Sequence, residues 1–294
     1  ITSIHKLNRK LSEICEQTYL DVPVYCNELS NKHRLSTPIL TARKNLLKRL
    51  LEFGNKENLD FDTEKFPPEK TIYLAMLKKT GIHRLEEQSL WGYGAPSDKS
   101  FLPLWNVCLD FLNSARNNKQ KVSDLYEILT TSKTLKLKKG FVDFWVPIFL
   151  ICNKEKYALY LQNEDNYIPF LDSDVLDLLH KKPSNYIIKT FNTDSVSAVW
   201  LNEYKNFTGS NLNEIKGIES SSISIFSNFI RFYRGLNEYS RTTQSISAAS
   251  VKLRDAIGKS SKDPYNALFE KMPASLGYYP LNENQSEAYK AKLK

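Results

Sequence analysis

The chain has 294 residues, of which 41% are hydrophobic and 25% charged, and it carries a formal net charge of +8. These values are ordinary for a soluble globular protein and allow one large domain or two to three small ones. The apolar run at residues 141–152 is too short to span a bilayer and contains Asp143 and Pro147, so no transmembrane segment is expected.

The cysteines indicate a reducing compartment. All four lie far apart among apolar neighbours, as Cys15, Cys26, Cys108 and Cys152. This scatter is typical of reduced core thiols in the cytoplasm and argues against both a disulfide frame and a metal site. Residue 1 is Ile, and the sequence opens and closes inside amphipathic patterns without a signal peptide, which indicates a piece of a longer protein.

The first third of the chain is predicted to be helical. An apolar stripe over residues 4–15 indicates an N-terminal helix, and a second helix is expected from Thr37 as N-cap to Gly54 as stop. The outer face of this second helix is formed by Arg43, Lys44, Lys48 and Arg49. A solvated face is the simplest interpretation of these charges, and contact with nucleic acid or an acidic partner is the alternative.

Two further helices are expected before residue 118. One begins at the pair Pro67-Pro68 and ends at Gly81, and the other covers residues 100–117. The Gly- and Pro-containing segment 90–99 between them is predicted to be a loop. Residues 1–118 therefore form a predicted helical region.

Residues 119–192 carry the order helix, helix, β-hairpin, helix, strand. Ser123 can cap the first helix, Gly140 opens the second, and Asp172 or Ser173 can cap the third. The hairpin strands are expected at residues 156–161 and 167–171, and the last strand at 186–191. This order predicts a winged-helix-like module at the centre of a mainly α chain.

The simplest form of DNA reading is not expected from this module. The helix before the hairpin offers apolar side chains over residues 141–151, whereas a groove-reading helix presents Arg, Lys, Asn or Gln. Burying each large apolar side chain is worth roughly 1.5–3 kcal/mol. We therefore expect this helix to be core, and the module to be a packing centre or a protein-docking element.

Positive charge is concentrated in two segments. Residues 31–56 carry a net charge of +6, and residues 119–156 a net charge of +4. Two basic patches on a mildly basic body permit attraction to phosphate backbones without demanding it.

Residues 193–294 read as a third, helical region punctuated by glycines. The final polar segment, residues 282–294, is expected to form a helix whose partner surface lies outside this chain.

No motif in the chain commits to catalysis. Gly258-Lys259-Ser260 has the end of a phosphate-binding loop, but Leu253 stands where its first glycine should be and no strand precedes it. Glu203 and Lys205 downstream of Asp194 match a nuclease pattern only superficially, and a surface ion pair explains them better. Whether the chain is an enzyme stays open at this point.

Four sets of short phrases resemble a known family. They are LSEICE (11–16), NELSNK (27–32) and LSTPI (35–39); PPEKTIY (67–73) and TGIH (80–83); LKKGF (137–141), YALY (157–160) and YIP (167–169); and LNEYSRTT (236–243), RDA (254–256) and DP (263–264). Together they resemble the region downstream of the P-loop core in large bacterial anti-phage defence ATPases of the phage-exclusion and phage-growth-limitation type.

The resemblance implies a non-catalytic, winged-helix-containing segment that couples the ATPase to partner proteins or to DNA. It places ATP and Mg²⁺ in an N-terminal part of the parent protein, with no cofactor in this chain, and implies the ATPase domain and other defence-system subunits as partners. No membrane partner is expected.

Contact with duplex DNA would run through phosphates and be independent of sequence. The residues expected to make it are Lys133, Lys136, Lys138, Lys139, Arg43, Lys44, Lys48 and Arg49. The alternatives are a stand-alone DNA-acting hydrolase whose site cannot be recognised from sequence, and a purely structural oligomerisation segment.

Overall fold

The structure is a computed structural model that describes residues 3–86, 90–116, 118–162, 166–190, 195–209, 222–259 and 263–293. The chain is mainly helical, as predicted, and divides into two units built from separate stretches of sequence. Unit 1 comprises Ile1–Ser114, Gln120–Asn153 and Leu171–Tyr186, and unit 2 comprises Ala115–Lys119, Lys154–Phe170 and Ile187–Lys294. These units differ from the three predicted regions, because residues 119–192 contribute to both.

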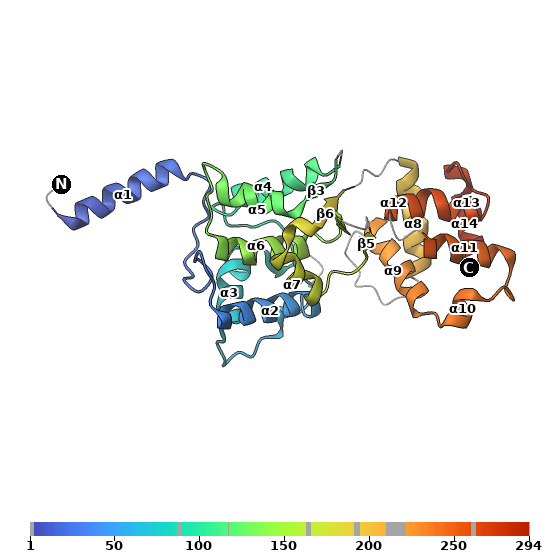
Figure 1. Ribbon diagram of the computed structural model, residues 1–294, viewed down its shortest axis with the longest axis horizontal. Coiled ribbons are helices and arrows are strands. Elements are labelled where there is room, and N and C mark those ends of the chain that lie inside the picture. The colour runs from blue at the N-terminus through green and yellow to red at the C-terminus, as the bar shows by residue number, and fades with distance from the viewer. Residues whose placement is uncertain are drawn as a thin grey trace. The chain divides into compact units, whose positions relative to one another are not determined.

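Unit 1 is mostly helical (Figure 1). Its α-helices are α1 (Ile4–Thr18), α2 (Thr37–Glu52), α3 (Pro68–Tyr73), α4 (Leu102–Ser114), α5 (Val122–Thr131), α6 (Lys139–Cys152) and α7 (Ser173–Lys181). Shorter elements are η1 (Glu57–Asp60), the π-helical turn η2 (Leu74–Lys78), η3 (Pro183–Asn185) and the strands β1 (His83–Leu85), β2 (Trp91–Tyr93) and β3 (Gln120–Lys121).

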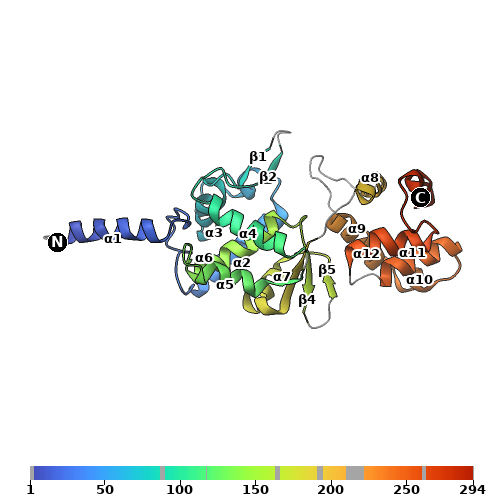
Figure 2. The same ribbon diagram turned by 90° about the horizontal axis from the view of Figure 1, so that it is seen from above.

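Helix α6 is the core of unit 1, as the sequence predicted. Every residue from Gly140 to Ile151 is buried, including Asp143 and Pro147. The helix contacts α2, α5 and α7, and it lies among them and α4 in both views (Figures 1 and 2). The expectation that this helix is sealed from solvent is therefore confirmed, and α6 cannot be a groove-reading helix.

Aromatic packing fixes α4 against α6. Trp105 of α4 lies edge-on to Phe149, with ring centroids 5.1 Å apart, and the Trp145 ring stacks on Phe141 at 6.0 Å. The indole N–H of Trp145 donates to the Sγ of Cys108 at 3.4 Å. Such aromatic pairs add to the free energy gained by burying their surface, so α6 is held by geometry as well as by its hydrophobicity.

Helix starts differ from prediction by one or two residues. Ser36, not Thr37, is the N-cap residue of α2, and α5 begins after Lys121, so that Ser123 lies inside it. The capping role of Asp172 is confirmed, because its side chain accepts from the backbone N–H groups of Asp174 and Val175. These shifts change no helix face.

A short hairpin occupies part of the predicted loop 90–99. Strands β1 and β2 are antiparallel, with His83 opposite Tyr93. The buried imidazole of His83 accepts from the Tyr73 hydroxyl through Nδ1 at 2.8 Å and donates through Nε2 to the Gly54 carbonyl at 2.9 Å, an assignment of tautomer that follows from these partners. Burial lowers the pKa of His83, so this histidine is a neutral structural hydrogen-bonding group.

Unit 2 combines a hairpin with a helical body. Its strands are β4 (Ala158–Leu161), β5 (Asn166–Ile168) and β6 (Tyr186–Lys189), and its helices are α8 (Ser195–Gly209), α9 (Ser222–Gly235), α10 (Glu238–Thr242), α11 (Ala248–Lys259), α12 (Pro264–Asn266), the π-helical η4 (Ala267–Lys271), α13 (Met272–Ser275), η5 (Glu283–Gln285) and α14 (Ser286–Leu293). Strands β4 and β5 are antiparallel, as the hairpin prediction required, with Leu159 opposite Ile168.

The elements of residues 119–192 occur in the predicted order, but the structure does not establish a winged-helix module. The helices α5, α6 and α7 belong to unit 1, whereas the β4–β5 hairpin belongs to unit 2. Within unit 2 the hairpin is fixed to α9, because the Tyr167 hydroxyl lies 2.9 Å from the Ser227 hydroxyl and Ser227 donates to the Pro169 carbonyl.

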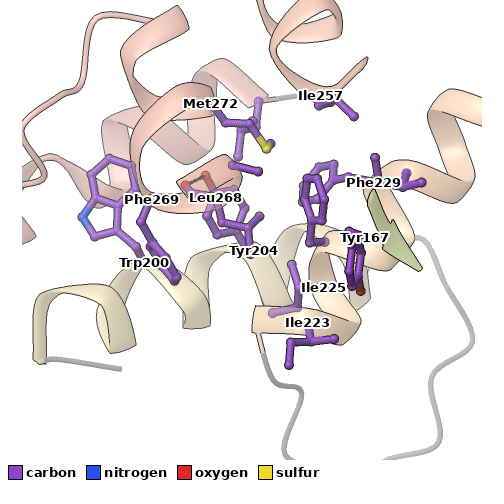
Figure 3. Close-up of a cluster of buried hydrophobic side chains, with 14 of the residues drawn as sticks. Tyr167, Trp200, Tyr204, Ile223, Ile225, Phe229, Ile257, Leu268, Phe269 and Met272 are labelled. Atoms are coloured by element: carbon purple, nitrogen blue, oxygen red, sulfur yellow. Dashed lines mark hydrogen bonds between the residues drawn. The ribbon is translucent and has the colours of Figure 1, made fainter. Parts of the chain in front are cut away.

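Large apolar and aromatic side chains from several helices form the core of unit 2 (Figure 3). The Tyr204 hydroxyl donates to the Leu268 carbonyl at 2.7 Å and lies 2.8 Å from the Tyr289 hydroxyl. Burial raises the pKa of Tyr204 well above its ordinary value. This buried polar contact therefore joins α8, η4 and α14 without an ionised group.

The prediction that the C-terminal helix packs on a surface outside the chain is wrong. Tyr289 of α14 is fully buried, with its ring 4.6 Å from that of Trp200 in α8. Glu203 of α8 pairs with Lys290 at 2.8 Å, which is the ion pair expected of Glu203 but with a different lysine. The partner surface of α14 is α8 of the same unit.

A membrane-crossing segment would need a long apolar helix. Within the described ranges, no helix combines that length with that hydropathy.

Candidate nucleic-acid interface

Two basic loops meet at the start of α6. The backbone N–H of Gly140 donates to the Lys32 carbonyl at 2.7 Å, and the Lys138 ammonium donates to the Asn31 carbonyl at 3.4 Å. A side chain at residue 140 would collide with the Lys32 carbonyl and with Leu35, so glycine permits this close approach. The contact brings residues 31–35 beside residues 133–140, a neighbourhood that the sequence does not show.

Alternating burial turns the lysines of the second loop outward. Leu135 and Leu137 are buried, whereas the lysines on either side of them are exposed. Lys136 adopts a left-handed φ of 41°, which is uncommon for a residue with a Cβ atom. Backbone hydrogen bonds to the Ser132 and Leu129 carbonyls hold the loop on both sides of this turn. The loop is therefore anchored by its leucines and presents its lysines.

We call the resulting feature the basic loop surface. It consists of the exposed side chains of Lys32, Arg34, Lys133, Lys136, Lys138 and Lys139. In the part of the chain that the structure describes, none of the six lies within 4.0 Å of a carboxylate oxygen. Its positive charge is therefore available to an external anion.

The N-terminus of α6 adds to this positive potential. Its first turn carries no acidic residue, and Lys138 and Lys139 occupy the N-cap and first helical positions. Helix dipoles favour negative charge at this end, so two lysines here are placed against the preference of the helix. An anion beside them would be attracted both by the two ammonium groups and by the positive end of the helix dipole, and that end of the dipole is a usual reason why anions bind at helix N-termini.

The lysines of α2 are exposed but lie near carboxylates. The Lys44 ammonium is 4.0 Å from Asp174, and the Lys48 ammonium is 3.9 Å from Glu52. These distances leave α2 less positive than its sequence suggests. Lys44 and Lys48 are therefore weaker candidates for phosphate contact than the basic loop surface.

The side chain of Arg49 binds the backbone of η1 in its own unit. Its NH1 atom donates to the carbonyls of Leu59 and Asp60, each at 3.0 Å, and its guanidinium lies 4.4 Å from the centre of the Phe61 ring. Residues 58–60 have positive φ angles, so this loop needs external hydrogen bonds to hold its shape. The side chain predicted to contact phosphates is thus used to fix η1.

The prediction that Arg43 lies on the outer face of α2 is wrong. Its side chain is 2% exposed and forms an ion pair with Asp177 of α7 at 3.2 Å. Arg43 falls in the same helical stripe as the buried residues Ala42, Leu46 and Leu47. The helical periodicity of these apolar residues indicates that position 43 faces the core. An arginine at a core position must be paired with an acidic group.

Arg43 belongs to a buried polar cluster among α2, α5, α6 and α7. Asp143 Oδ1 lies 3.3 Å from His180 Nδ1. Burial lowers the pKa of Arg43, and the nearby carboxylates of Asp177 and Asp143 partly oppose this effect. Arg43 Nε and NH1 and the Tyr126 hydroxyl make no hydrogen bond to a described protein group. The two pairs join α2 and α6 to α7, and the burial of Arg43 and Asp143 keeps them away from macromolecular ligands.

The described residues form neither a metal site nor a phosphate-binding loop. Among the described residues, no group of three or more His, Cys, Asp or Glu side chains could hold a metal ion. Gly258 lies inside α11, where a Cβ atom would meet the Tyr233 hydroxyl at 2.7 Å. Glycine at this position permits close packing against Tyr233. Asp194, Ser260 and the side chain of Lys205 lie outside the described residues.

Four members of the basic loop surface were predicted from the sequence to contact phosphates, and two were not. Lys133, Lys136, Lys138 and Lys139 were recognised as a lysine-rich segment before an apolar helix, whereas Lys32 and Arg34 were noted only as charge. Their membership depends on the Gly140–Lys32 contact, which joins residues more than a hundred positions apart. Comparisons of the chain with protein-family models, curated proteins and solved structures gave no match.

Proposed function

We propose that this chain is a non-catalytic interaction module that binds the phosphate backbone of duplex DNA through the basic loop surface, without reading sequence. The observation that carries the proposal is the meeting of two lysine- and arginine-bearing loops at Gly140, with six exposed basic side chains lacking a carboxylate within 4.0 Å in the described structure. Lysine serves phosphate contact well because it is a flexible point charge, whereas bidentate recognition is favoured by the planar guanidinium of arginine.

Burial of α6 supports the absence of base reading. The helix that a winged-helix order would place in the major groove has no exposed side chain between Gly140 and Ile151. Contact would therefore be limited to phosphates and would depend strongly on salt. If all six side chains release counterions, affinity falls roughly a thousandfold between about 50 and 200 mM salt.

Binding is tested by fluorescence anisotropy with two duplexes of unrelated sequence at these two salt concentrations. We expect equal affinity for both duplexes, a steep loss with salt, and a smaller salt slope for the variant K136E/K139E. The matched control is K44E/K48E, which reverses lysines that lie close to carboxylates on α2.

Two outcomes would contradict the proposal. Absence of binding at low salt would leave only a protein-docking role for the chain. Equal loss of affinity in both variants would show that general charge attraction, and no particular surface, holds the DNA.

The resemblance extends the proposal to a larger protein. In that reading the chain is a segment of a large bacterial anti-phage defence ATPase in the cytoplasm, with a winged-helix-like arrangement of residues 119–192, and couples the ATPase domain to other subunits or to DNA. ATP and Mg²⁺ would be bound in a part of the protein preceding Ile1. Sequencing the gene upstream of the codon for Ile1 tests this, since the proposal requires a Walker A motif there.

A further inference from the structure

The C-terminal end of α9 exposes arginines beside an aromatic ring. Arg231, Phe232 and Arg234 are all exposed, and the side chain of Phe232 is 65% exposed. Gly235 lies one helical turn from both Arg231 and Phe232, and a Cβ atom there would meet nothing within 4 Å. This part of the helix is therefore open in the described structure.

Helix α10 brings a second aromatic residue and a third arginine to the same end of α9. Arg241 donates to the Arg234 carbonyl, and its guanidinium lies 5.7 Å from the centre of the Tyr233 ring. Tyr239 precedes Arg241 by two residues and is 71% exposed. Two residues of chain span at most about 7 Å, so the Arg241 contact keeps Tyr239 close to the end of α9.

The three arginines keep their positive charge. In the ranges that the structure describes, none of Arg231, Arg234 and Arg241 lies within 4.0 Å of a carboxylate oxygen. Glu238 is the single acidic residue of segment 231–241, whose net charge is therefore +2. We call the exposed side chains of Arg231, Phe232, Arg234, Tyr239 and Arg241 the arginine–aromatic surface.

Arginines between exposed rings suit a ligand that has both phosphates and flat bases. The guanidinium of Arg231 already lies 4.9 Å from the centre of the Phe170 ring, which follows β5. A guanidinium stacks on flat rings as well as pairing with phosphates. Proteins bind single strands in this way, with unpaired bases stacked on aromatic side chains and the backbone held by positive charge. A duplex keeps its bases stacked inside and offers such rings no partner.

We infer that the arginine–aromatic surface binds single-stranded nucleic acid, with bases stacked on Phe232 and Tyr239 and phosphates held by the arginines. This surface belongs to unit 2, and it is separate from the duplex-binding surface proposed for unit 1. Arginines alone would attract any anion, including a phosphorylated peptide. The two exposed rings favour a ligand that carries bases as well.

The first test is fluorescence anisotropy of the full chain with oligo(dT) of about 15 nucleotides, within the usual site size, and with a duplex of the same length. The variant F232A/Y239A removes both rings and keeps every charge. It should lower the affinity for oligo(dT) by more than about tenfold and leave the affinity for the duplex unchanged. The matched control F66A/Y279A removes a Phe and a Tyr that are 64% and 54% exposed elsewhere, and should change neither affinity.

The second test locates the bound strand and separates stacking from charge. Oligo(dT) carrying iododeoxyuridine should cross-link on irradiation to peptides that contain Phe232 or Tyr239. The variant R231K/R234K keeps both charges but loses the planar groups, and should bind oligo(dT) at least about threefold more weakly. Circular dichroism and melting temperature should stay unchanged in all variants, because the substituted side chains are exposed.

Three results would overturn the inference. They are equal affinity of F232A/Y239A and the natural chain for oligo(dT), cross-links confined to unit 1, and displacement of oligo(dT) by an equal concentration of a phosphorylated peptide.

The variant K136E/K139E distinguishes this inference from the proposed function. It should bind the duplex more weakly and keep its affinity for oligo(dT). A natural chain that binds oligo(dT) and no duplex would contradict only the proposed function. One that binds the duplex and no oligo(dT) would contradict only the inference about unit 2.

Discussion

At the scale of single residues, the burial of Arg43 shows that not every basic residue of α2 belongs to its exposed face. The Arg43 guanidinium pairs with Asp177, which also holds Lys181 at 2.7 Å, so the charge is neutralised inside the unit. The hydrogen bond from Lys181 and the charges of Lys181 and Arg43 lower the pKa of Asp177. The pair is thus kept ionised, and it joins α2 to α7.

We expect Arg43→Ala to destabilise the chain by roughly 3 kcal/mol, the lower end of the cost of breaking a buried ion pair, because Asp177 keeps Lys181. The control Lys44→Ala removes an exposed charge one position further along α2 and should cost less than about 0.5 kcal/mol. Urea denaturation of both variants measures the free energy of unfolding. If Arg43→Ala were as stable as the control, Arg43 would not be a structural cross-link.

At the scale of elements, Gly140 links the core helix to the candidate interface. A Cβ atom at this position would meet the backbone carbonyl of Lys32 closely, lie 2.8 Å from Leu35 Cδ2 and lie 3.1 Å from the Ser30 carbonyl. Backbone atoms cannot move aside as a flexible side chain can. The loop carrying Lys32 and Arg34 must therefore shift whenever residue 140 acquires a side chain.

We predict that Gly140→Ala lowers the free energy of unfolding by about 1–3 kcal/mol, as overpacking of a closed contact does, and also weakens DNA binding. The matched control is Gly235→Ala at the end of α9, where a Cβ atom would meet nothing within 4 Å. Thermal unfolding and anisotropy on the same samples measure both effects. A Gly140→Ala variant that melts like Gly235→Ala would contradict the close approach.

Elements specified by neighbouring residues were predictable, and contacts between distant ones were not. The α6 helix, the β4–β5 hairpin and the Asp172 cap follow from local patterns of hydrophobicity and capping. Strands β1 and β2 were missed because each has only three residues, too few to show alternation. The burial of Tyr289 against Trp200 depends on a contact spanning most of unit 2, to which a short polar segment gives no local signal.

For the candidate interface, too, some features were predictable from neighbouring residues and others depended on distant contacts. Exposure of Lys136 and Lys138 follows from their alternation with the buried Leu135 and Leu137, which the sequence shows directly. The pairing of Lys44 with Asp174 and of Arg43 with Asp177 joins residues of α2 to α7, and no spacing within α2 indicates it. Net charge over a segment therefore overstates the charge that a partner can meet.

At the scale of the whole molecule, the two units are interleaved in sequence. Unit 1 is assembled from three stretches and so is unit 2, so no single cut in the chain separates them. Each unit nevertheless has a core of its own, built on α6 in unit 1 and on the aromatic cluster of α8, α9, η4 and α14 in unit 2. Local stability should then be set by each core separately.

We therefore expect core substitutions to act within one unit, and hydrogen exchange followed by mass spectrometry of the full chain measures this. Phe144→Ala in α6 and Leu268→Ala in η4 both remove fully buried side chains, at a cost of roughly 2–5 kcal/mol each. Peptides of α2, α4 and α6 should lose protection only in the first variant, and peptides of α8, α9 and α14 only in the second, because opening of a cooperative unit exposes its own amides. Loss of protection throughout the chain in either variant would show that the two cores unfold as one.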